Sequence, residues 1–339
     1  MNVRERALRA KAASRILARQ SRARKDAALD RIADAIVADA ARIEAANEED
    51  VRRGRDAGLS AALLDRLALS GEQIQALARA VKQVAALPDP VGSRSAMHRA
   101  SNGLLIGKQR LPIGLIAIVY ESRPNVTVDA AALTLKSGNA VLLRGGKEAA
   151  STNALLVEIM RRALADADLP EDAVCLVPPG DREEIRELVS LTEIVDLAIP
   201  RGGEGLIRFV AEVARVPVIK HYKGVCHLFL DESAELDMAR SLTLNSKVQR
   251  PGVCNALECL LVHQRSAERL LPELGRALIA EGVELRACER ARALVAGARA
   301  AAESDFGAEF LDKVLAIRVV DDLEAALSHI ERYGSNHTE

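Results

Sequence analysis

The chain has 339 residues, of which 49% are apolar and 28% charged, and its formal net charge at pH 7 is −1. This length suits one large or two ordinary domains, and this composition is typical of a soluble globular protein. A net charge so close to zero gives no whole-chain reason to expect nucleic acid or an anionic membrane surface as a partner. No stretch approaches the run of about 20 apolar residues that a membrane helix needs, which argues against a membrane protein.

The N-terminal region, residues 3–88, is predicted to be helical. Gly58 and Ser60 mark the end of one helix and the start of the next, and Ser70 with Gln73 fits a capping box. The first 25 residues are Arg-rich and nearly acid-free, as in an organelle transit peptide. Their apolar residues recur at helical spacing, which favours a solvated helix. A hairpin arm is predicted at about residues 97–112, with a possible role in oligomerisation.

Between residues 113 and 230, short β-branched runs alternate with helical segments. The predicted strands are 113–119, 140–143, 174–177, 194–199, 216–219 and 227–230, and the predicted helices are 126–138, 150–166, 181–190 and 203–214. Nearly continuous apolar strands that alternate with helices indicate a parallel sheet covered on both faces. Such sheets bind ligands at the carboxyl ends of their strands.

The same rhythm begins again after Asp231. Helices are predicted at 234–246, 266–281 and 322–332, and strands at 257–263, 283–287 and 314–320. We therefore predict an α/β protein with two parallel-sheet domains, 1–232 and 233–339.

The cysteines indicate a reducing compartment and one candidate nucleophile. The five, Cys175, Cys226, Cys254, Cys259 and Cys288, include no C-x-x-C pair. This argues for the cytoplasm and against disulfides or a metal site. Cys254 follows Arg250, Pro251 and Gly252, so it lies in a turn with a cationic neighbour, where a thiol becomes a nucleophile. The alternative is a buried cysteine that only fills space.

Two glycine-rich turns each lie between a predicted strand and a predicted helix. They are Arg144-Gly145-Gly146-Lys147 and Arg201-Gly202-Gly203. Such a turn offers N–H groups and a helix dipole to a phosphate, although glycine also serves ordinary tight turns. Together the two turns favour a dinucleotide, and the side chains of Arg144 and Lys147 suit the 2′-phosphate of NADP.

Three further polar positions can be interpreted from the sequence. The first two each have a functional and a structural interpretation, and the third has a structural one. Asn125 follows the first strand, where its amide can donate to an oxyanion or cap the next helix. The segment Lys220–Gly224 is unusually polar, so it either binds an anionic substrate or is a solvated connection. His227 lies in an apolar run and is interpreted as a core histidine.

Five motifs taken together resemble the gamma-glutamyl phosphate reductase family, also called glutamate-5-semialdehyde dehydrogenase, of the aldehyde dehydrogenase superfamily. They are Tyr120–Asp129, Lys136–Glu148, Ile199–Gly203, Gly224–His227 and Gln249–Cys254, and the similarity is colinear from the N-terminal helices to Glu339. The resemblance implies an aldehyde dehydrogenase-like fold with two Rossmann-like domains. It also implies NADPH-dependent reduction of L-glutamyl 5-phosphate to L-glutamate 5-semialdehyde and phosphate, in proline biosynthesis.

The resemblance also implies roles for individual residues. Cys254 would attack the γ-carbonyl and form a thioester, while Asn125 and the Cys254 backbone N–H would hold the oxyanion. Hydrolytic aldehyde dehydrogenases use a glutamate base to activate water, whereas Lys220–Gly224, at the equivalent place, has no carboxylate. The cations of Lys220, Lys223 and Arg250 would instead attract the phosphate or the substrate carboxylates.

The family continues beyond the length of this chain, with a further strand, a glycine-rich loop and a C-terminal association arm. We therefore expect a truncated catalytic domain and a homo-oligomer that is weakened by the missing arm. Two alternatives stay open: a catalytically silent dinucleotide-binding or oligomerisation module, and an aldehyde dehydrogenase that acts on another aldehyde. Glutamate kinase is the metabolic partner that the resemblance implies.

Overall fold

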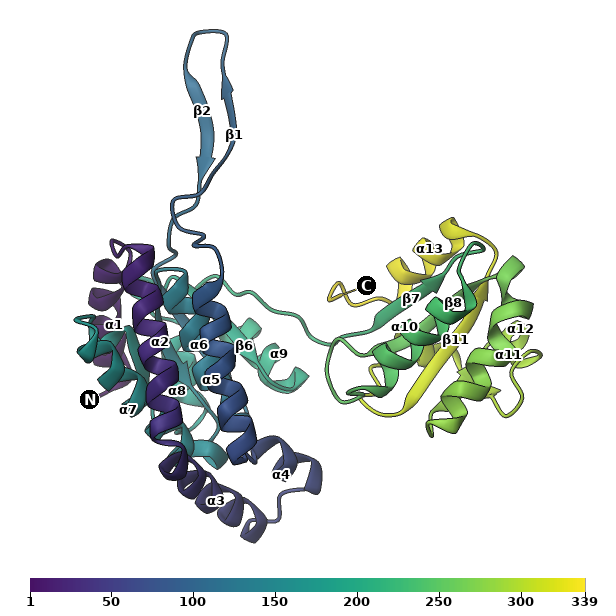
Figure 1. Ribbon diagram of the computed structural model, residues 1–339, viewed down its shortest axis with the longest axis horizontal. Helices are drawn as coiled ribbons and strands as arrows, with labels where there is room; N and C mark the ends of the chain where they lie inside the picture. Colours follow the sequence, from purple (N-terminus) through teal and green to yellow (C-terminus); the bar gives the residue numbers. More distant parts are fainter. Residues whose placement is uncertain (339) are drawn as a thin grey trace. The chain divides into compact units, whose positions relative to one another are not determined.

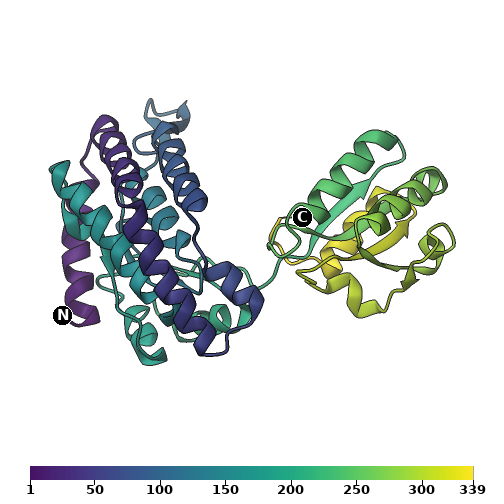
Figure 2. The same ribbon diagram turned by 60° about the horizontal axis from the view of Figure 1, so that its bottom comes forward.

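The computed structural model describes residues 1–338, apart from the side chains of residues 61 and 62. The chain divides into two compact units, residues 1–220 and residues 221–339 (Figures 1 and 2). Within the described residues, no helix combines the length and the apolar character needed to cross a bilayer.

The first unit begins with a helical region, as predicted, and this region contains five helices. These are α1 (Val3–Leu17), α2 (Arg22–Ala38), α3 (Ala40–Asp56), α4 (Ala61–Leu67) and α5 (Gly71–Ala86). Side-chain oxygens satisfy the first N–H groups of several of these helices, and the predicted capping box of Ser70 and Gln73 is confirmed. Ser60 caps α4, which confirms the predicted helix start at that residue.

A four-stranded parallel sheet follows, in the order β5-β4-β3-β6. Its strands are β3 (Leu115–Tyr120), β4 (Ala140–Arg144), β5 (Val174–Leu176) and β6 (Leu197–Arg201). The connecting helices are α6 (Asn125–Lys136), α7 (Ala150–Asp166), α8 (Arg182–Leu188) and α9 (Glu204–Val213), with short 3-10 turns η1 (Lys147–Ala149) and η2 (Glu171–Ala173). Every residue of β3 is buried because helices cover both faces of the sheet, as the continuous apolar run predicted.

The predicted strand 216–219 is wrong. Only one isolated bridge, between Ala198 and Val218, forms there. Pro217 accepts a hydrogen bond from the Ala198 N–H, but it has no N–H of its own and cannot extend a ladder.

The order of the sheet reverses between β3 and β6. From β3 the chain runs outward through β4 to β5, and then returns to the other side of β3 as β6. A ligand crevice in such a sheet lies outside the carboxyl ends of the strands at this reversal. Glu121 and Gly202, which follow β3 and β6, are therefore at the expected dinucleotide site.

An antiparallel hairpin precedes this sheet, as predicted. Its strands are β1 (Arg94–Arg99) and β2 (Leu105–Gln109), and every residue of both is exposed. The predicted role of this hairpin in oligomerisation stays a prediction.

The second unit holds a five-stranded parallel sheet in the order β10-β9-β11-β8-β7. Its strands are β7 (Cys226–Leu230), β8 (Leu257–His263), β9 (Glu284–Ala287), β10 (Arg299–Ala300) and β11 (Val314–Val320). Helices α10 (Leu236–Val248) and α11 (Gln264–Ala280) cover one face, while α13 (Leu323–Tyr333) and the 3-10 turn η3 (Glu303–Gly307) contact β11 on the other. The short helix α12 (Glu289–Arg292) lies beside β9 and β11.

The division between the units falls twelve residues before the predicted boundary at residue 232. The reason is the pairing of β7, which lies parallel to β8 and so belongs to the second sheet. The apolar sequence of this strand is compatible with either sheet, so it does not indicate which one the strand joins.

Candidate active site

The turn that carries Cys254 joins α10 to β8 and is fixed at both ends by a buried ion pair. Lys247 Nζ lies 2.7 Å from Glu258 Oε2, and the two side chains are 0% and 1% exposed. The other carboxylate oxygen of Glu258 accepts a hydrogen bond of 3.0 Å from the Leu311 N–H. Burial lowers the pKa of Lys247 and raises the pKa of Glu258, and their mutual hydrogen bond opposes both shifts.

A second segment of the chain presses against the backbone of Cys254. A Cβ atom added to Gly224 would lie 1.8 Å from the Cys254 carbonyl oxygen, so only glycine fits. The Gly224 N–H donates to Glu309 Oε1 at 2.9 Å, and the neighbouring Val225 N–H donates to Ser335 Oγ at 2.9 Å. Residues 221–226, the Cys254 turn and the segment after α13 therefore meet in the second unit.

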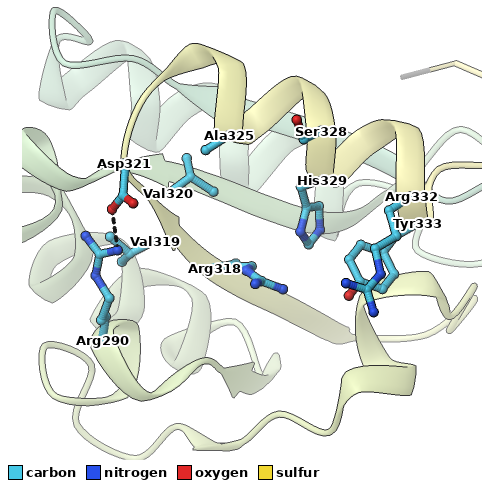
Figure 3. A pocket seen from close by; sticks show the side chains of 10 residues that line it. All are labelled: Arg290, Arg318, Val319, Val320, Asp321, Ala325, Ser328, His329, Arg332 and Tyr333. Atoms are coloured by element: carbon cyan, nitrogen blue, oxygen red, sulfur yellow. Dashed lines mark hydrogen bonds and ion pairs between the residues drawn. The ribbon is translucent and has the colours of Figure 1, made fainter.

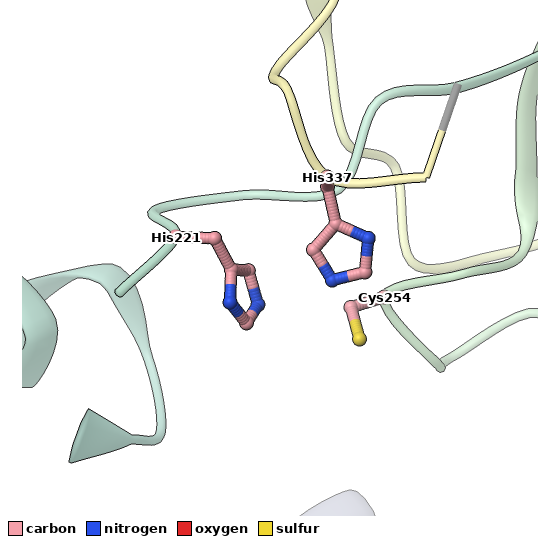
Figure 4. A group of neighbouring side chains, drawn as sticks. All are labelled: His221, Cys254 and His337. Atoms are coloured by element: carbon pink, nitrogen blue, oxygen red, sulfur yellow. The ribbon is translucent and has the colours of Figure 1, made fainter. Parts of the chain in front are cut away.

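This meeting brings two histidines to Cys254. Figure 4 shows the side chains of His221, Cys254 and His337 facing one common space. One donor atom from each side chain lies within 4.8 Å of those of the other two. The two imidazole rings meet edge to face, with centroids 4.2 Å apart. A thiol beside two imidazoles is an arrangement suited to nucleophilic chemistry or to metal binding.

The remaining cysteines are less suited to catalysis. Cys175, Cys226 and Cys259 are buried, whereas Cys254 and Cys288 are partly exposed. Burial raises the pKa of the Cys175 thiol to about 11, and it also raises the pKa of Cys259. A raised pKa keeps a thiol protonated and unreactive. The structure thus leaves Cys254 as the strongest candidate nucleophile in the part of the chain that it describes.

The three cations predicted to bind substrate have different surroundings. Lys223 Nζ donates to the Gly307 carbonyl at 2.7 Å. Arg250 is exposed beside the Cys254 turn, and Lys220 is exposed at the end of the first unit. Their roles in substrate binding stay predictions.

Asn125 lies in the first unit, as the first residue of α6 rather than its cap. The cap position is Pro124, which has no side chain that accepts a hydrogen bond, so the capping alternative is wrong. The Asn125 side-chain amide donates to Asp129 Oδ2 at 3.0 Å. Burial raises the pKa of Asp129.

The first predicted cofactor turn follows β4. Gly145 and Gly146 are buried, and Lys147 is exposed at the start of η1. Arg144 donates from Nη2 to the Gly180 carbonyl at 2.7 Å, while its Nε is buried without a hydrogen-bond partner among the described residues. Burial lowers the pKa of Arg144. An unsatisfied buried guanidinium nitrogen suits a site that receives an anionic group.

The second predicted turn, after β6, already holds an internal carboxylate. The Gly203 N–H, at the cap position of α9, donates to Glu121 Oε2 at 2.8 Å. Arg201 and Gly202 are exposed beside it. The start of α9 therefore binds a negatively charged group, as expected from the helix dipole and free N–H groups.

The second unit also has a cationic cavity that does not include Cys254. It encloses about 320 Å³ between β11 and α13, and its charged and aromatic lining includes Arg290, Arg318, His329, Arg332 and Tyr333 (Figure 3). Arg290 forms an ion pair with Asp321 at 2.6 Å, and Arg332 forms one with Glu303 at 3.1 Å.

Comparison with known proteins identifies the class to which this fold and site belong. The sequence profile described as the aldehyde dehydrogenase family matches residues 1–284. The crystal structure of gamma-glutamyl phosphate reductase from Thermotoga maritima has a TM-score of 0.90 and 41% identity, covering 98% of this chain and 81% of that one. The chain therefore belongs to the aldehyde dehydrogenase family of oxidoreductases, which implies a nicotinamide dinucleotide cofactor.

Curated relatives narrow this class. The gamma-glutamyl phosphate reductase of Sorangium cellulosum (strain So ce56) is 57% identical over 336 residues, which cover 98% of this chain and 79% of the relative. That of Xanthomonas campestris pv. campestris (strain B100) is 51% identical over 339 residues, covering 100% of this chain and 82% of the relative. Within the superfamily, the chain belongs to the gamma-glutamyl phosphate reductases, and the resemblance found in the sequence is confirmed.

Sequence reasoning missed four residues around Cys254. Lys247 and Glu258 are eleven positions apart, and no local pattern indicates that their charged groups form a buried pair. His221 and His337 lie near the two ends of the second unit, so only the fold brings them to the thiol.

Proposed function

We propose that this chain reduces L-glutamyl 5-phosphate with NADPH to L-glutamate 5-semialdehyde and phosphate, through a thioester on Cys254. The proposed enzyme acts in the cytoplasm, in proline biosynthesis, and the glutamate kinase that makes the acyl phosphate is its metabolic partner. One observation carries the proposal: Cys254 is a partly exposed thiol in a turn held by the buried Lys247–Glu258 pair. The exposed hairpin of β1 and β2 supports a homo-oligomer.

The first unit supports the cofactor part of the proposal. NADPH would be held by the turns Arg144–Lys147 and Arg201–Gly203, at the carboxyl ends of β4 and β6. The unsatisfied Nε of Arg144 and the anion-binding start of α9 fit phosphate groups. Arg144 and Lys147 favour NADP over NAD because a 2′-phosphate needs cationic partners. When bound, NADPH supplies the hydride that reduces the thioester carbonyl.

Cys254 performs the covalent steps. Its thiolate attacks the γ-carbonyl carbon, the new C–S bond forms, and the carbonyl becomes an oxyanion. The oxyanion collapses, the carbon–oxygen bond to phosphate breaks, and phosphate leaves with the bonding electrons. After the thioester is reduced to the oxyanion of a hemithioacetal, this oxyanion collapses, the C–S bond breaks, Cys254 leaves as thiolate and the semialdehyde is released.

Two donors are proposed for the oxyanion, the Cys254 backbone N–H and the Asn125 amide. Removing such a donor costs roughly 10²–10³-fold in rate, so we expect that loss for Asn125→Ala. The segment Lys220–Gly224 contains no carboxylate, so this segment supplies no base to activate water against the thioester. Lys220, Lys223 and Arg250 are proposed to attract the substrate anions.

The reverse reaction tests the proposal most directly. Purified protein is mixed with L-glutamate 5-semialdehyde and NADP⁺, with and without inorganic phosphate, and NADPH formation is followed by absorbance. We expect turnover that requires phosphate, is lost in Cys254→Ala, and persists in the control Cys288→Ala, which alters the other partly exposed cysteine. Turnover without phosphate would instead indicate NADP⁺-dependent oxidation of the aldehyde to the free acid, with water in place of phosphate as the acceptor of the acyl group. Cofactor binding without turnover would indicate a silent dinucleotide-binding module.

A further inference from the structure

We propose that His221, Cys254 and His337 form a binding site for a soft divalent cation, with Zn²⁺ as the ion of best fit. One thiolate and two imidazoles are the ligand types that zinc selects, and their potential ligand atoms lie within 4.8 Å of one another. The consequence for activity rests on the proposed function: an ion held by the Cys254 thiolate removes the nucleophile and inhibits the enzyme.

The geometry requires only a small contraction. In a tetrahedral zinc site, bonds of about 2.0–2.3 Å separate neighbouring ligand atoms by about 3.3–3.7 Å. Because the three donor atoms lie within 4.8 Å of one another, they must approach by at most about an ångström. All three side chains are half-buried and lie outside helices and strands, so rotation of the side chains can achieve this.

The backbone around the site is already fixed. The close approach of Gly224 to the Cys254 carbonyl fixes the segment of His221, and the bond from the Val225 N–H to Ser335 Oγ fixes the segment of His337. The His337 Nδ1 lies 3.0 Å from Thr338 Oγ1, so we assign Nε2 as the ring nitrogen that would bind the metal. Ligand histidines in metal sites usually have such a second hydrogen bond, which fixes the orientation of the ring.

A second cluster in the same unit has a similar ligand set but a less suitable charge. His227, Cys259 and His329 also have donor atoms within 4.8 Å of one another. Burial raises the pKa of Cys259 and lowers the pKa of His329, and in both cases the nearby positive charge of the Arg318 guanidinium acts to lower the pKa. A divalent cation there would be repelled by this fixed positive charge. The second cluster therefore serves as a matched internal control.

Metal binding at the first cluster releases one proton and requires no other change in protonation. The Cys254 thiol loses its proton to solvent and forms the metal–sulfur bond, while the two neutral imidazoles bind through nitrogen lone pairs. Three protein ligands leave the fourth tetrahedral position to a water molecule. No redox step is involved, so a chelator should reverse the binding.

The test measures metal binding on the resting chain of residues 1–339, without substrate or cofactor. Zn²⁺ is titrated in competition with a chromophoric indicator, and Co²⁺ is used as a spectroscopic probe, because a cobalt–thiolate bond adds a near-ultraviolet charge-transfer band. The variants are Cys254→Ser, His221→Ala and His337→Ala, with Cys259→Ser as the matched control. Circular dichroism checks that each variant is folded.

We expect one Zn²⁺ per chain, with affinity reduced at least about tenfold in each of the three site variants and unchanged in Cys259→Ser. The cobalt charge-transfer band should disappear in Cys254→Ser and persist in Cys259→Ser. Equal zinc affinity in wild type and Cys254→Ser would overturn the proposal, and so would loss of binding in Cys259→Ser alone. Because these readouts need no turnover, failure of the reductase assay leaves them interpretable. Where turnover is present, Zn²⁺ should abolish it and a chelator should restore it.

Discussion

Gly224 is predicted to control the position of the nucleophile. In Gly224→Ala, the added Cβ would lie 1.8 Å from the Cys254 carbonyl oxygen and 2.8 Å from its carbonyl carbon. Both atoms belong to the backbone, so no side-chain rotation relieves the clash. Ordinary carbon–oxygen contact requires a separation of about 3.2–3.4 Å, so the two segments must part by about 1.5 Å.

A displacement of this size has two measurable effects. Misplacing a catalytic group by about 1 Å can reduce the rate about 10²-fold, so we expect kcat of Gly224→Ala to fall by at least that factor. Overpacking typically destabilises a fold by about 1–3 kcal/mol, which urea unfolding followed by circular dichroism would detect. The reverse reaction with L-glutamate 5-semialdehyde, NADP⁺ and phosphate gives kcat.

Gly252 provides a matched control for this experiment. It lies two residues before Cys254, and an added Cβ would have its nearest contact at 3.7 Å, with the Leu311 carbonyl oxygen. Gly252→Ala should therefore retain kcat within about threefold of wild type. The steric reasoning would be refuted if Gly224→Ala retained wild-type kcat, or if both variants lost activity equally.

Three further predictions concern stability, measured as the free energy of unfolding in urea. Glu258→Gln leaves the Lys247 ammonium buried without its counter-ion and should cost about 3–5 kcal/mol, whereas Lys247→Met combined with Glu258→Gln should recover most of that loss. Burial and the nearby cations lower the pKa of His329 from 6.5 to about 4, so its neutral form stabilises the fold above pH 6.5. About 3 kcal/mol of stability should be lost as the pH falls from 6.5 to 4, and His329→Gln should flatten that dependence. Asn47→Ala leaves the buried Leu67 carbonyl and Leu69 N–H unsatisfied, for a cost of about 2–4 kcal/mol; a loss below 0.5 kcal/mol would contradict this estimate.

Local sequence patterns predicted many elements of the fold closely. The strands 257–263 and 314–320 and the helix 150–166 have their predicted bounds. Each is a long apolar or periodic run between polar residues, and such runs fix an element by local burial alone. The predicted strand around Pro217 was wrong because a pattern of apolar residues gives no information about the N–H group that proline lacks.

Pairing between distant segments could not be predicted in the same way. The run 226–230 was recognised as a strand, yet nothing in it says which sheet it joins, and this shifted the predicted boundary. The candidate site shows the same limit. Cys254 was found from its immediate neighbours, whereas His221 and His337 reach it only through the tertiary fold. The close approach of Gly224 to the Cys254 carbonyl likewise cannot be predicted from the sequence, because the sequence does not distinguish a glycine in close contact from one in an ordinary turn.

Because the carboxylate of Glu121 occupies the start of α9, a cofactor phosphate that binds there must replace it. A phosphate that arrives at the Gly203 N–H must first displace an anion that the protein itself supplies. The free energy gained at this turn is therefore the binding free energy of the phosphate minus that of the Glu121 carboxylate, and not the full attraction of the helix for one anion. Anions that bind no better than a carboxylate gain nothing there, so this internal competitor makes the turn selective for strongly charged groups and leaves the helix end satisfied between binding events.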